Sequence, residues 1–341
     1  METPSLCPTQ LVCPLCQTSG RVGVHSHAER RYKCHACGKT FVETVGTPLY
    51  DLKYPAWLVI LVLTLLAHGC PLQAIVVAFQ LDERTVAAWQ AKAGQHGEAI
   101  QAGVVCQGQV ELGQVQADEL KVKTQRGAVW MATAMTVFSR LFLWGEVGSQ
   151  RTKGLVERVL AHVRAAAGSV PQAVLFAVDG FAAYPNAIKK YFYTPVQTGK
   201  PGRPAHSVWP DLHIVQVVKS RAGQKLVDIQ RRVVHGCQAR VDDLIALSQW
   251  GFGLINTAFI ERLNATCRAR MPALARRTRN LARTPERLRR EMFWTGVVYN
   301  FVTIHSSLET TPAVAAGLTD HPWSVRELLL FRPPHEASTM S

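Results

Sequence analysis

The chain contains one stretch that decides its fold, Ala173-Val174-Leu175-Phe176-Ala177-Val178-Asp179-Gly180. Its first six residues are all apolar, which is typical of a strand buried on both faces of a largely parallel sheet. Asp179 follows at the carboxyl end of this strand, and open α/β sheets place their ligands at such strand ends. The stretch therefore predicts an α/β fold with Asp179 in a functional position.

The segments on both sides of this strand extend the α/β pattern. Three strand-like segments and a helical segment precede it, at 110–124, 127–139, 141–147 and 153–167. Another strand follows at 212–219, and from Asn256 to about His305 the chain is helical and rich in arginine. Three strands, a helix, a strand and then helices is the element order of an RNase H-like core with a mixed five-stranded sheet. We expect this domain to span 110–305, with a C-terminal tail at 306–341.

The composition points to a polyanionic partner. The 341 residues include 38 Lys and Arg against 24 Asp and Glu, which gives a formal net charge of +14 at pH 7. Nucleic acid is the commonest partner for such an excess, and an acidic membrane surface is the alternative. The longest apolar run, 56–67, is too short to span a bilayer, and no secretory signal is visible. We therefore expect no membrane partner and a cytoplasmic, nucleoid-associated protein.

Paired cysteines mark the first domain, 1–45. Cys13-Pro-Leu-Cys16 is followed by Cys34-His-Ala-Cys37, and this spacing suits two knuckles that hold one tetrahedral Zn²⁺. Gly38 would supply the backbone freedom that the second knuckle needs. A redox site would use a single pair. The four cysteines therefore predict a structural zinc ribbon.

A second DNA-binding unit is predicted at 55–95. Two short helical segments, 71–79 and 83–92, are separated by a turn, and Asp82 suits the N-cap of the second. This pattern fits a helix-turn-helix whose second helix enters the major groove, although a plain helical hairpin would look the same. The stretch 94–109, rich in Gly and Gln, is interpreted as a linker.

Two further acidic residues accompany Asp179. The segment 116–123 alternates with period two, so Asp118 lies on an apolar face, where an unpaired carboxylate is costly unless it holds a metal ion. Of the late glutamates, Glu286 follows Thr284-Pro285 and suits a helix N-terminus, and Glu291 has neighbouring arginines as surface partners. Glu261 lies among apolar residues near the start of a helix. Each acid alone could be an ordinary turn, ion-pair or solvated residue; together they predict a triad of Asp118, Asp179 and Glu261.

With these residues the chain resembles a bacterial insertion-sequence transposase of the DDE class, and is most similar to the insertion-sequence-one type. The resemblance covers about 13–330 and rests on the following stretches: Ala117-Asp118-Glu119-Leu120; Val178-Asp179-Gly180-Phe181 with Tyr184; Asn256-Thr257 with Ile260-Glu261-Arg262-Leu263-Asn264; Phe138-Ser139-Arg140; Tyr299-Asn300; His305-Ser306-Ser307-Leu308; and Thr311-Pro312-Ala313. Arg268 departs from the pattern, since related enzymes often have lysine there, and so does Val137, where many have aspartate.

The resemblance implies a fold, an activity and a set of cofactors. The fold is RNase H-like, and the triad would hold Mg²⁺ or Mn²⁺ as a two-metal site. The activity is binding to the ends of the mobile element, hydrolytic cleavage there, and joining of the 3′ ends to target DNA by transesterification. Two DNA ends imply a homodimer or a larger assembly. The alternative is a domesticated, catalytically silent DNA-binding regulator, against which the complete triad argues.

Arginine dominates the segment that follows Glu261. Between Glu261 and Arg290 there are ten arginines and two glutamates, and a merely solvated face would mix charge signs and include lysine. We therefore expect contacts with the DNA backbone. The candidate DNA-binding residues are Arg268, Arg270, Arg276, Arg277 and Arg279, with Arg203 in a separate basic loop.

Overall fold

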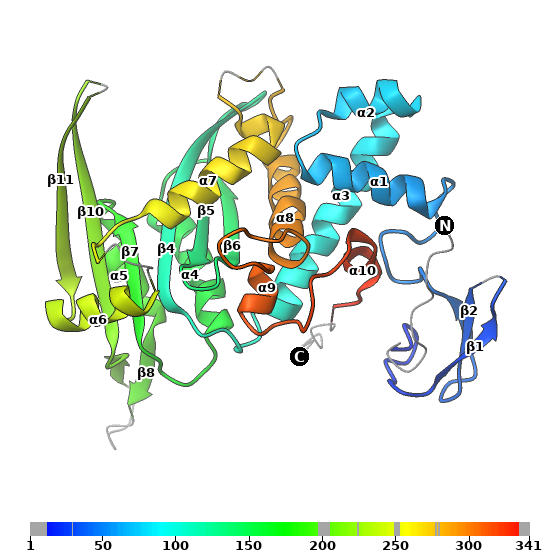
Figure 1. Ribbon diagram of the computed structural model, residues 1–341, viewed down its shortest axis with the longest axis horizontal. Helices are drawn as coiled ribbons and strands as arrows, with labels where there is room; N and C mark the ends of the chain where they lie inside the picture. The colour runs from blue at the N-terminus through cyan, green and yellow to red at the C-terminus, as the bar shows by residue number, and fades with distance from the viewer. Residues whose placement is uncertain are drawn as a thin grey trace.

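A six-stranded mixed sheet forms the centre of the computed structural model (Figure 1), which describes residues 12–28, 30–196, 205–223, 225–248, 253–276, 278 and 280–333. The strands lie in the order β11-β10-β7-β4-β5-β6. Their bounds are Gly113–Thr124 (β4), Gly127–Thr136 (β5), Phe142–Gly148 (β6), Val174–Asp179 (β7), Leu212–Ala222 (β10) and Lys225–His235 (β11). The β7 strand is parallel to β4 and β10, and the remaining pairs are antiparallel. The mixed α/β class is confirmed, but the expected number of five strands is wrong.

The strand that the sequence does not predict is β11. Its sequence, KLVDIQRRVVH, has no continuous apolar run, and eight of its eleven residues are exposed. It lies at the edge of the sheet and pairs only with β10, so its side chains do not need to be apolar. An edge strand of this kind has no sequence pattern of the sort that identifies β7.

Helices cover both faces of the sheet. On one face, Phe176 and Val178 of β7 share a core with α4 (Lys153–Ala166) and α5 (Ala183–Tyr191). On the other face, Leu175 and Ala177 pack against α6 (Gln238–Ser248). Helix α7 (Ala258–Arg270) crosses this second face over β4, where Leu120 packs with Ile260. A separate two-stranded ladder, β8 (Tyr193–Val196) with β9 (Ala205–Val208), follows α5.

The N-terminal part consists of a small sheet and three helices. Strands β1 (Val22–Ser26), β2 (Arg31–Cys34) and β3 (Thr40–Val42) form an antiparallel sheet. Helices α1 (Ala56–Ala67), α2 (Leu72–Phe79) and α3 (Glu83–Ile100) follow. The Asp82 side chain accepts hydrogen bonds from the backbone amides of Arg84 and Thr85, so the predicted N-cap is confirmed. Among the described residues, no helix is long and apolar enough to cross a membrane.

The stretch 94–109 is not a linker, because α3 continues through Gly94 to Ile100 and a π-helical turn, η2 (Gln101–Val105), follows. Helix α3 lies side by side with α8 (Pro285–Phe301), as Figure 1 shows. Gly94 faces the backbone of Arg290, and Gly97 faces that of Phe293, so closely that a Cβ atom at position 94 would overlap the Arg290 carbonyl oxygen. The glycines that suggest a flexible segment are thus the contact points between two helices.

Residues 306–333 pack against the body of the protein. Ala313 of α9 (Pro312–Ala315) and Leu328 and Leu329 of α10 (Val325–Leu330) are fully buried in the main core. His96 of α3 bonds the carbonyl oxygen of Leu328 at 3.1 Å. Arg332 donates to the carbonyl oxygens of Val45 and Glu43 and so attaches this segment to the N-terminal sheet.

We expect Gly94→Ala to destabilise the protein, although glycine-to-alanine changes within helices usually stabilise by up to about 1 kcal/mol. The added methyl group would force α3 and α8 apart, at a cost of about 1–3 kcal/mol. Gly154→Ala in α4 is the matched control, since its nearest neighbour would lie 3.8 Å away. Urea unfolding of the two variants measures the difference, and equal stability would contradict close α3–α8 packing.

Candidate functional site

The four paired cysteines come together as the sequence predicts. Their sulfur atoms all lie within 4.8 Å of one another, with Cys13 and Cys37 3.8 Å apart and Cys16 and Cys34 3.6 Å apart. These distances match the edge of a tetrahedron with Zn–S bonds of about 2.3 Å. Gly38 has φ of 73°, so the second knuckle does use the left-handed conformation. The group could hold a metal ion, and its all-thiolate donor set suits zinc.

The second cluster is built by the pairing of β4 with β7. Ala117 is aligned with Val178 in the parallel ladder, so the following residues, Asp118 and Asp179, lie beside each other on neighbouring strands. One carboxylate oxygen of each lies within 4.8 Å of the other and of Glu119. Oxygen donors at this separation are the ligands that hard divalent cations prefer. This acidic cluster could therefore bind a metal ion.

Helix α7 is attached to the strand that carries Asp118. The Gln116 side-chain oxygen accepts hydrogen bonds from the backbone amides of Phe259 and Ile260, at 3.1 and 2.9 Å, and so caps the helix N-terminus from outside. One and a half turns on, the buried Asn264 donates to Asp118 at 2.8 Å. The sequence predicts a cap from Asn256 or Thr257. The Asn256 side-chain oxygen accepts a hydrogen bond from the amide of Ala258 at 3.0 Å, whereas the side chain of Thr257, at the N-cap position, caps no backbone amide.

Glu261 lines the same cavity as the two aspartates. It lies outside the close cluster formed by Asp118, Glu119 and Asp179. Asp118, Asp179 and Glu261 line a cavity of about 680 Å³ together with Arg268. The Glu261 carboxylate is half-exposed, accepts a hydrogen bond from Thr257 at 3.0 Å and forms an ion pair with Lys219 of β10. The structure thus brings the three predicted acids to one cavity, with Glu261 held by a basic residue.

Sequence reasoning did not identify the pair formed by Glu119 and Arg151. Glu119 points to the α4 side of the sheet, and its side chain is fully buried, where Arg151 donates to it at 2.8 Å. The same guanidinium group donates to Asp179 at 2.5 Å and lies 4.3 Å from the Phe181 ring centre. Arg151 therefore links the back of the sheet to the acidic cavity. No local signal could reveal a contact between residues so far apart in sequence.

Burial and charge repulsion shift the pKa values of the cluster. Desolvation, aided by repulsion from Asp179 and Glu119, raises the pKa of Asp118 to about 6. Desolvation also raises the pKa of Glu119, against the opposing effect of Arg151. A bound divalent cation would stabilise the ionised form of these crowded carboxylates, because its positive charge offsets the repulsion between them.

Some arginine side chains of the arginine-rich segment bond other residues of the protein, and others are accessible to a ligand. Arg289 bonds Glu98 and Glu146, both at 2.7 Å, and Arg270 donates to Thr303 at 3.0 Å. Arg268 lines the acidic cavity, and Arg276 is exposed. The predicted DNA-binding residues Arg203, Arg277 and Arg279 lie outside the described residues. Several arginines of this run therefore stabilise the fold rather than remain free for a ligand.

The other late glutamates have different positions. Glu286 is exposed and pairs with Arg290 at 2.9 Å, within the first turn of α8, as the sequence predicts. Glu291 is buried, with 8% of its surface exposed, and has no surface partner, so that expectation is wrong. Helical periodicity explains this, because Glu291 lies on the face of α8 that carries Leu288 into the core.

Support for a function comes from these two sites. In comparisons with known proteins, no family model and no curated protein matches the chain. The geometry offers a four-thiolate group suited to one metal ion and a carboxylate cavity with basic residues at its rim. The second arrangement can bind a divalent cation and an anionic ligand together.

We expect Cys34→Ser to release bound zinc, since Cys34 is fully buried in the thiolate group. Plasma mass spectrometry of the purified protein should find one zinc ion per chain, and none in the variant. Cys237→Ser, at an exposed cysteine elsewhere, is the control and should retain zinc. A parent protein without zinc would rule out the ribbon.

In the absence of Mg²⁺ and Mn²⁺, Asp118→Asn should stabilise the protein at pH 8. The folded-state pKa of Asp118 is about 6, above its unfolded value of about 4, so stability is lost as the pH rises through 6. A shift of about two pH units corresponds to at most about 3 kcal/mol, which the variant should recover at pH 8 and not at pH 4. Urea unfolding measures this. Asp179→Asn, which takes a charged partner from Arg151, should give no such gain.

Proposed function

We propose that this protein is a DDE-class DNA transposase with an RNase H-like catalytic core. The observation that carries the proposal is the meeting of Asp118 and Asp179 on adjacent parallel strands, with Glu261 on the helix that β4 itself caps. Strand, strand end and late helix is the arrangement that the sequence resemblance implies for a two-metal site. The predicted zinc ribbon and α2–α3 unit would bind DNA.

The residues of the cavity would have two kinds of role in the reaction, as metal ligands and as residues that position those ligands. Asp118 and Asp179 would hold the divalent ions, and Glu261 would complete the site after release from Lys219. When bound, such ions activate the attacking oxygen and stabilise the leaving oxygen of a phosphodiester. Asn264 holds the Asp118 carboxylate in place, and Arg151 holds that of Asp179. A carboxylate fixed in advance loses less freedom when it binds a cation.

Basic residues at the rim supply contacts for the DNA backbone. Arg268 lines the cavity two turns after Glu261, and Arg262 and Arg276 are exposed near it in sequence. Guanidinium groups bind phosphate oxygens in bidentate fashion. A phosphate contacted by Arg268 would lie beside the acidic cluster. The scissile bond and the carboxylates would then share one cavity.

The non-enzymatic regulator is a second candidate, and one observation favours it. Glu261 pairs with Lys219, and Asp179 pairs with Arg151, so two of the three proposed metal ligands already have cationic partners. A protein that no longer cleaves DNA could keep such pairs permanently. An enzyme must exchange at least the Lys219 pair for a metal ion. Cleavage assays separate the two candidates.

Glu261→Gln should abolish strand cleavage while leaving binding to the element ends intact. The amide keeps the shape but loses the charge that a divalent cation needs, so cleavage should fall roughly 10³-fold or more. The assay uses labelled DNA carrying the inverted repeats that flank the gene, with cleavage in Mg²⁺ and binding by gel shift. Glu286→Gln, the same change at an exposed glutamate, should cleave like the parent.

Two outcomes would count against this assignment. Normal cleavage by Glu261→Gln would show that Glu261 is not a metal ligand. Glu119 would then be the remaining candidate for the third carboxylate. A parent protein that binds the repeats but never cleaves them, in Mg²⁺ or Mn²⁺, would favour the regulator.

A further inference from the structure

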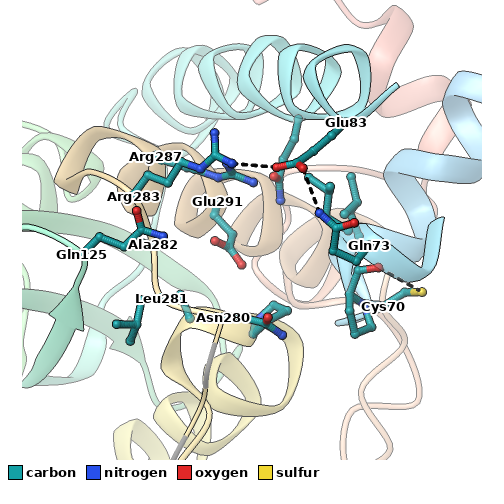
Figure 2. Close-up of a pocket in the computed structure, with 16 residues that line it drawn as sticks. Cys70, Gln73, Glu83, Gln125, Asn280, Leu281, Ala282, Arg283, Arg287 and Glu291 are labelled. Carbon is teal, nitrogen blue, oxygen red and sulfur yellow. Dashed lines mark hydrogen bonds and ion pairs between the residues drawn. The ribbon is translucent and has the colours of Figure 1, made fainter. Parts of the chain in front are cut away.

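A second polar cavity lies where the N-terminal helices meet α8 (Figure 2). Its volume is about 220 Å³. The walls come from the start of α2, from α3, from the turn between β4 and β5, from η3 (Pro272–Leu274), from residues 280–283 and from α8. The cavity is separate from the acidic one and shares none of its lining residues.

The unusual feature of this cavity is the carboxylate of Glu291. Figure 2 shows it pointing into the cavity, between Asn280 and Arg287. The residue is 8% exposed, and within the described part of the chain its carboxylate accepts no hydrogen bond and forms no ion pair. Burial raises its pKa to about 7, against the opposing effect of the nearby Arg287 charge. A buried carboxylate of this kind costs stability unless a ligand supplies donors.

A guanidinium group lines the same cavity and acts on Glu291 through its charge, without a hydrogen bond to the carboxylate. Arg287 lies one turn before Glu291 on α8, and its side chain has no hydrogen bond or ion pair among the described residues. Arg283 is already bonded to Glu83 at 2.8 Å, and Gln73 bonds the same carboxylate at 2.9 Å. The cavity thus presents the carboxylate of Glu291 and the guanidinium group of Arg287, with Gln90, Gln125 and Asn280 as further polar residues in its lining.

We propose that this cavity binds a guanine base. The Glu291 carboxylate would accept the N1–H and N2–H groups of the base, and Arg287 would donate to O6 and N7. Guanine alone among the four bases offers two adjacent donors on one edge and two adjacent acceptors on another. Adenine offers a carboxylate only its one exocyclic amino group, and thymine offers a single N–H, so neither can donate to both carboxylate oxygens as guanine does.

The guanine could come from a DNA strand or from a free nucleotide. The DNA source rests on the proposed function, since an unpaired base of a bound element end would have to enter the cavity, as bases do in enzymes that extrude them. A free nucleotide needs no DNA contact at all. The recognition chemistry is the same in both cases, so both sources can be tested with one set of variants.

The test is calorimetric titration of the full-length protein with 2′-deoxyguanosine monophosphate and the other three nucleotides. Only the guanine nucleotide should bind, and Glu291→Gln should weaken it about tenfold to a hundredfold, the worth of one bidentate base contact. Glu286→Gln is the matched control on the same helix and should leave binding unchanged. Thermal melting verifies that both variants are folded.

The pH dependence provides a second readout. The other titratable or charged groups that line the cavity are Arg287 and Arg283, Glu83 on α3, and Cys70 before α2. Since the ionised carboxylate is the acceptor, affinity should rise from pH 6 to pH 8 in the parent and not in Glu291→Gln. An affinity that does not change with pH in the parent would contradict the role of Glu291.

A competition experiment identifies the source. If a thymidine oligonucleotide with one central guanine displaces the nucleotide better than one without guanine, DNA is the source; if it does not, the source is the free nucleotide. No binding of the guanine nucleotide, equal binding of all four, or unchanged binding in Glu291→Gln would overturn the proposal. Cleavage depends on Glu261 and is scored separately, so loss of one result leaves the other standing.

Discussion

The parallel pairing of β4 with β7 is the constraint on which the rest of the acidic cavity depends. This pairing sets Asp118 beside Asp179, and the same strand offers Gln116 as the cap of α7. Helix α7 then brings Glu261 to the cavity and Asn264 to Asp118. A shift of one residue in this register would turn Asp118 to the opposite face and remove the cap from α7 at once.

Much of this arrangement is predictable from local patterns. The apolar run before Asp179 identifies β7, the alternation around Asp118 places its side chain on the α7 face, and the cysteine spacing identifies the thiolate group. Each pattern is short and depends on neighbours in sequence. The helical segments of α2 and α3 also follow from local signals, including the N-cap at Asp82.

What could not be predicted depends on distant contacts. Arg151 bonds Glu119 and Asp179 across the end of the sheet, and the role of Gln116 exists only because α7 arrives there, more than a hundred residues later. The edge strand β11 needs no apolar run, because one of its sides has no neighbouring strand. Gly94 suggests flexibility when only its own segment is considered, although α8 turns it into a packing contact.

The close approach of α3 to α8 has a geometric consequence. The backbones of the two helices are in contact at Gly94. The N-terminal helices and the sheet therefore form one packed unit rather than two domains joined by a flexible linker. Under the function that we propose, a DNA end bound at α3 would reach the acidic cavity after a fixed number of base pairs. The length of the DNA between these two contacts would then matter more than its sequence.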